Sequence, residues 1–209
     1  MLFRFFDGFF LYGFFLSWSK DDLFNWVDPQ LRDNSDRDYK WLESIWLRNQ
    51  HMSGINRTIG KLFSLSVNLP EFLLEFPDSK ILYIIRDPLS VIPSGLSLIT
   101  GVLDKRFGFW NLPIEKRQHF IDRLYYGLMQ LQLRFHDDWI NGRIDKSMVL
   151  IVPFDRMMYD FDKLMNEILK FIDHLPSDDL IEEINKTAEK QRNFKSAHEY
   201  DLGKFGLSS

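Results

Sequence analysis

Arg86 and Ser94 are the residues whose types and spacing most directly suggest chemistry. An arginine guanidinium binds a phosphate group through two parallel hydrogen bonds, and a serine hydroxyl can donate to the same group. Between them, Asp87 suits a helix N-cap and Pro88 suits the first helical position, so a helix is predicted to begin there. Pro93 removes one backbone hydrogen bond from that helix and is expected to kink it just before Ser94. The pattern predicts a phosphate-binding site at a helix start.

Two short apolar runs are predicted to position these residues as buried parallel strands. Residues 80–85 read KILYII and residues 148–152 read MVLIV, without the alternation of a half-exposed strand. In open α/β sheets, ligands bind beyond the carboxyl ends of the strands. Arg86 directly follows the first run, which places it at such an end.

Helical spacing of apolar residues predicts the connecting elements. Helices are expected over 40–49 and 115–139, after the second strand, and after a cap at Ser177. Residues 28–39 are polar and rich in turn formers, which predicts a surface loop. The order of strand, helix, helix, strand and helix indicates an α/β fold with a parallel sheet.

The composition predicts one globular domain over residues 1–209 and excludes several classes of site. With 45% hydrophobic residues, the chain has the composition of a globular protein. Its net charge is −4, so no general affinity for nucleic acid is expected. It has no cysteine, which excludes a disulfide scaffold, a thiolate metal site and a cysteine nucleophile. It also lacks an HExxH motif and clustered histidines, so no metal is expected.

The first 59 residues form an aromatic-rich part whose opening segment, 1–18, resembles a targeting signal only superficially. Asp7 interrupts it, Gly8 and Gly13 weaken it as a helix, and the run 9–18 is shorter than the roughly 20 residues of a membrane span. We therefore expect a packing helix, no transmembrane segment and a cytoplasmic protein. A membrane-surface anchor over 2–18 is the alternative, and the same segment could pair two copies as a homo-oligomer.

Residues 76–88, FPDSKILYIIRDP, followed by Val91 and Ser94, resemble the 3′-phosphate-binding motif of sulfotransferases. The resemblance covers residues 60–209 and implies a three-layer, P-loop-like α/β domain with a parallel central sheet. It also implies transfer of a sulfuryl group from 3′-phosphoadenosine 5′-phosphosulfate (PAPS) to a hydroxyl or amine on a small-molecule or carbohydrate acceptor. By this resemblance, Arg86 and Ser94 bind the 3′-phosphate.

Two later stretches agree with the resemblance. Residues 149–155, VLIVPFD, look like the family's later strand and acidic loop, with Asp155 and Arg156 at the position of its acidic pair. The C-terminal residues 198–207 look like the HxYxLxxFGL ending of the bacterial-type branch. By resemblance, Arg192 and Lys195 approach the phosphates; the alternative is a solvated basic patch at the end of the last helix. The catalytic residue is not assigned.

One departure from the family is that no P-loop-like segment, which holds the 5′-phosphosulfate in sulfotransferases, precedes the strand before Arg86 in this sequence. Residues 54–61 resemble a Walker A motif only loosely, because the spacing is one residue too long and Leu62 replaces the Ser or Thr. We expect the chain to be the C-terminal part of a longer sulfotransferase. The alternatives are a catalytically silent protein that binds a nucleotide or a partner, and a P-loop kinase that depends on Mg²⁺ and ATP.

Overall fold

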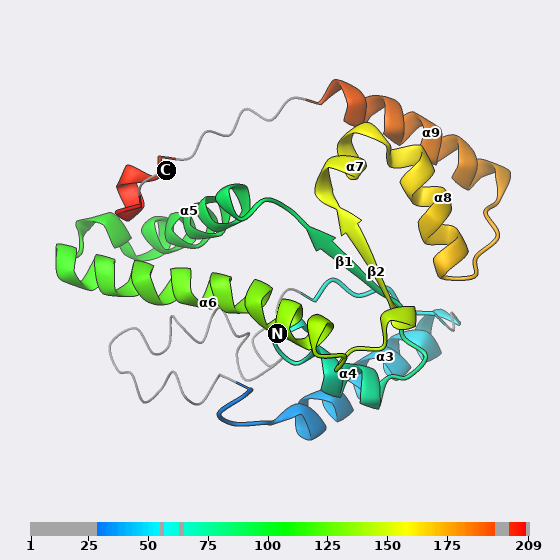
Figure 1. Ribbon diagram of the computed structural model, residues 1–209, viewed down its shortest axis with the longest axis horizontal. Helices are drawn as coiled ribbons and strands as arrows, with labels where there is room; N and C mark the ends of the chain where they lie inside the picture. The colour runs from blue at the N-terminus through cyan, green and yellow to red at the C-terminus, as the bar shows by residue number, and fades with distance from the viewer. Residues whose placement is uncertain (1–28, 55–56, 63–64, 195–200, 208–209) are drawn as a thin grey trace. The chain divides into compact units, whose positions relative to one another are not determined.

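The computed structural model describes residues 29–54, 57–62, 65–194 and 201–207 (Figure 1). The predicted helix within 1–18 lies outside these residues. In chain order, the helices and strands are α3 (Ser35–Ser53), α4 (Leu69–Glu75), β1 (Ile81–Ile85), α5 (Pro88–Phe107), α6 (Ile114–Ile140), β2 (Val149–Pro153), α7 (Phe154–Tyr159), α8 (Phe161–Phe171) and α9 (Asp178–Asn193).

The chain divides into two compact units. One comprises the described residues up to Pro77, together with Ser94–Ile144 and the described residues from Leu202 onward. The other comprises Asp78–Pro93 and the described part of Asp145–Asp201. The boundary between Pro93 and Ser94 falls inside α5, at the proline that cannot donate a helical hydrogen bond.

The first unit is built around α6, whose apolar spacing predicted a helix in this place. Phe120 and Leu124 of α6 are completely buried, and the helix packs against a short 3₁₀ turn, η2 (Leu65–Val67). Tyr39 of α3 joins this core, and its hydroxyl donates a hydrogen bond to the backbone carbonyl of Asn68 at 3.0 Å. The unit therefore has an apolar core with a satisfied tyrosine hydroxyl.

The predicted loop over 28–39 is wrong in its second half, because α3 begins at Ser35. The Asp33 carboxylate accepts a hydrogen bond from the Ser35 backbone N–H at 2.9 Å. Asp36 lies in the first turn, where a negative charge favours the helix dipole, and it pairs with Lys40 at 2.6 Å. Polar residues typical of a loop thus stabilise a helix start.

The second unit contains the parallel strand pair that the sequence predicted. β1 and β2 run side by side in register from Ile81 opposite Val149 to Ile85 opposite Pro153 (Figure 1). The prediction that β1 is buried is wrong, since Ile84 and Ile85 are 51% and 42% exposed. Within the described residues the sheet has two strands, so β1 is paired along one edge only.

Three helices follow β2 in the second unit. α7 and α8 both contact α9, which presents Ile184 and Ala188 as its buried face. The predicted cap is present, because the Ser177 hydroxyl accepts a hydrogen bond from the Leu180 backbone N–H at 3.3 Å. The described chain is thus mostly helical with a small parallel sheet, which is consistent with an α/β domain. None of the helices in the described ranges has the length and apolar character needed to span a membrane.

Candidate functional site

Arg86 lies immediately after β1, and the helix after it begins where the sequence predicted. Pro88 is the first residue of α5. The Asp87 carboxylate accepts a hydrogen bond from the Leu89 backbone N–H at 3.0 Å, and the Asp87 carbonyl accepts from Ser90 at 2.9 Å. The strand end and the capped helix start fix the backbone on both sides of Arg86.

The Arg86 side chain is exposed and makes a cation–π contact with one aromatic ring. Its guanidinium carbon lies 4.5 Å from the ring centroid of Phe154, the first residue of α7. Among the residues that the structure describes, none forms an ion pair or hydrogen bond with the Arg86 side chain. Its N–H groups therefore have no protein acceptor in the described chain, which suits binding of an external anion.

Ser94 lies within α5 and is half-buried. It is the first residue of the first unit after the boundary in α5, whereas Arg86 belongs to the second unit. The two residues of the predicted phosphate pair are thus divided between the units, and each is placed within its own.

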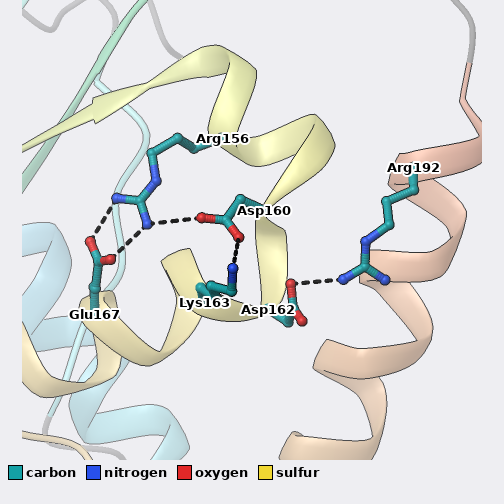
Figure 2. Close-up of polar contacts among 6 residues, drawn as sticks. All are labelled: Arg156, Asp160, Asp162, Lys163, Glu167 and Arg192. Atoms are coloured by element: carbon teal, nitrogen blue, oxygen red, sulfur yellow. Dashed lines mark hydrogen bonds and ion pairs between the residues drawn. The ribbon is translucent and has the colours of Figure 1, made fainter.

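Arg156 is occupied by carboxylates of the same unit (Figure 2). Its guanidinium donates two hydrogen bonds to Glu167 of α8, at 2.7 and 2.6 Å, and a third to Asp160 at 3.3 Å. The bonds from Arg156 hold the pKa of Glu167 below its ordinary value. Lys163 adds an ion pair to Asp160 at 3.3 Å. Arg156 therefore joins α7 to α8.

By resemblance, Arg192 was expected to approach the phosphates. Figure 2 shows that its side chain points to Asp162. The two side chains form an ion pair at 2.9 Å between the last turn of α9 and the first turn of α8. A phosphate at Arg192 would compete with that carboxylate. Lys195, the other predicted basic ligand, lies outside the described residues.

Phe154 is the contact residue that the sequence analysis missed. The apolar runs predict each strand by itself, and neither run gives the register between the two strands. Their register pairs Ile85 with Pro153, so the next residue of each chain segment, Arg86 and Phe154, emerges at the same strand end. Aligning the two apolar runs at their C-terminal ends would have indicated this neighbour.

No set of three or more histidine, aspartate or glutamate side chains within the described ranges is arranged to hold a metal ion.

Comparison with models of known protein families gives a match. A family model described as "Sulfotransferase family" matches residues 25–179, which is more than half of the chain. No curated protein and no solved structure matches. The matched range contains β1, β2, Arg86, Ser94 and Phe154, and it ends before Arg192. The motif around Arg86 and the family match agree, and the chain belongs to the sulfotransferase family.

Proposed function

We propose that this chain binds PAPS through its 3′-phosphate and supports transfer of the sulfuryl group to a hydroxyl or amine of a small-molecule or carbohydrate acceptor. The proposal includes the finer fold that the resemblance implies, a three-layer, P-loop-like α/β domain. The single observation that carries it is the environment of Arg86.

Three properties of Arg86 support a phosphate-binding role. It follows the carboxyl end of a parallel strand, where α/β domains bind ligands. It directly precedes the capped start of the 20-residue helix α5, whose dipole favours a negative charge. It is exposed and pairs with no described carboxylate. A guanidinium in this setting fits a doubly charged phosphate ester.

The role of Arg86 in the proposed reaction is to hold the donor and not to make or break bonds. When bound, the donor supplies the sulfuryl group. The acceptor oxygen or nitrogen loses a proton and forms a bond to sulfur as the bond between sulfur and the 5′-phosphate oxygen breaks, and adenosine 3′,5′-bisphosphate leaves. Fixing the nucleotide at its 3′-phosphate reduces the motion that the reacting groups must lose. Ser94 is assigned to the same phosphate by resemblance alone.

The proposal is tested by removing the Arg86 guanidinium. Arg86→Ala is expected to lower the affinity for adenosine 3′,5′-bisphosphate by about ten- to a hundredfold, because charge-assisted hydrogen bonds contribute about 1.5–3 kcal/mol. The affinity for adenosine 5′-phosphate, which lacks the 3′ group, should stay the same. Isothermal titration calorimetry with both nucleotides measures the change.

Arg48→Ala is the matched control, since Arg48 is an exposed arginine on α3. It should leave both affinities as in the unaltered chain. If Arg86→Ala keeps the full preference for the 3′-phosphorylated nucleotide, the assignment is wrong.

Transfer of ³⁵S-labelled sulfate from PAPS to a panel of carbohydrate, phenol and amine acceptors then separates an enzyme from a protein that binds the nucleotide without turnover.

A further inference from the structure

Phe154 supports the guanidinium of Arg86 from one side. Ile85 and Pro153 are partners in the strand register, so Arg86 and Phe154 leave the same end of β1 and β2. The guanidinium carbon lies 4.5 Å from the Phe154 ring centroid, well within the distance at which a cation is attracted to an aromatic face. The contact lies wholly within the second unit.

The backbone at Phe154 is held on both sides. Phe154 is half-buried and begins α7, directly after the last residue of β2. Two residues further on, Arg156 bonds α7 to Glu167 of α8 through two short hydrogen bonds and to Asp160 through a third (Figure 2). A planar two-bond arginine–carboxylate pair restricts both orientation and distance. The strand before Phe154 and the ion pair after it therefore limit how far the backbone that carries the ring can move.

The contact with Phe154 leaves the N–H donors of Arg86 available to a ligand. The ring face attracts the guanidinium charge, and the N–H donors of Arg86 form no hydrogen bond within the described residues. An exposed arginine without such a support must lose much of its rotamer freedom when it binds a ligand. A side chain already held on a ring has less freedom to lose, which raises affinity for the ligand.

We propose that Phe154 is a positioning residue that orients Arg86 toward the nucleotide's 3′-phosphate. This inference rests on the proposed function and adds to it a residue that acts through Arg86 and not on the phosphate. It predicts that the aromatic face of Phe154, more than the bulk of that side chain, strengthens the preference of Arg86 for a 3′-phosphorylated nucleotide.

The test measures the ratio of affinities for adenosine 3′,5′-bisphosphate and adenosine 5′-phosphate by calorimetry on the full chain. Phe154→Leu should lower this ratio by about two- to fivefold, the range expected for an exposed cation–π contact. Phe154→Tyr keeps the ring face and should restore the ratio of the unaltered chain. Phe171→Leu is the matched control, because the Phe171 ring centroid lies 5.1 Å from the ammonium of Lys80, which precedes β1, whereas Arg86 follows β1. It should leave the ratio unchanged.

A double-mutant cycle separates positioning from a general loss of structure. With Arg86→Ala already present, Phe154→Leu should produce no further change in the ratio, because the group that Phe154 orients is gone. A further loss in that background, or an equal ratio in Phe154→Leu and the unaltered chain, would overturn the inference while leaving the Arg86 site intact. If the unaltered chain itself shows no preference for the 3′-phosphate, the proposed function fails and this inference fails with it.

Discussion

At the scale of single residues, Asp138 of α6 is a carboxylate that the fold buries. Its side chain is 6% exposed, and it forms an ion pair with Arg143, whose side chain is 55% exposed. Burial raises the pKa of Asp138 above its ordinary value, and the charge of Arg143 opposes that rise. The folded chain therefore binds this proton more tightly than the unfolded chain. The group favours folding in acid, and that contribution is lost as the pH rises through the folded-state pKa.

Removing the Arg143 charge should make this effect larger. Arg143→Met is expected to lower the free energy of unfolding near neutral pH by about 1.5–3 kcal/mol, because a buried carboxylate loses part of its compensation. In mild acid the loss should shrink, since protonation of Asp138 removes the uncompensated charge. Urea unfolding at both pH values measures the difference.

Arg48→Met is the control for the Arg143 prediction, because Arg48 is exposed on α3. It should change stability by less than about 0.5 kcal/mol at either pH. A loss in Arg143→Met that is the same in acid and at neutral pH would show that Asp138 is not the group responsible.

At the scale of elements, the N-terminus of α9 is capped by the Ser177 side chain. The Ser177 hydroxyl accepts from the Leu180 backbone N–H at 3.3 Å, and Asp178 and Asp179 place negative charge in the first turn. Ser177→Ala should lower the free energy of unfolding by about 1 kcal/mol, as is typical for loss of an N-cap. Ser177→Asp keeps the acceptor and should retain nearly full stability. Equal losses in the two variants, measured by urea unfolding, would contradict a capping role.

The elements that the sequence predicted are those with a strong local signal. Both parallel strands, the start of α5 at Pro88, the long helix α6 and the cap at Ser177 are confirmed. Each depends on residues close together in the chain, such as an apolar run or an Asp-Pro pair. The start of α3 was missed because its first turn is polar, and polar first turns suit both a loop and a helix N-terminus.

Features that depend on partners distant in the chain could not be predicted. The apolar run of β1 does not reveal how many strands flank it, and in the described sheet Ile84 and Ile85 are exposed. The contact of Arg86 with Phe154 requires the register of two strands more than 60 residues apart. The candidate site was therefore predicted in its sequence motif but not in the environment of its arginine.

At the scale of the whole molecule, the family match runs through both compact units. Its residues 25–179 include Arg86 of the second unit and Ser94 of the first. The C-terminal residues that follow, with Arg192 and Lys195, lie beyond the match. Arg192 is bonded to Asp162, so its contribution to nucleotide binding stays a prediction based on resemblance.

The most direct test of this account is calorimetric titration of the unaltered chain with adenosine 3′,5′-bisphosphate and, separately, with adenosine 5′-phosphate. The bisphosphate is expected to bind tighter by about tenfold or more, because the guanidinium of Arg86 adds charge-assisted hydrogen bonds to the 3′-phosphate. Equal affinity for the two nucleotides, or binding of neither, would contradict the assignment of Arg86 as the 3′-phosphate anchor.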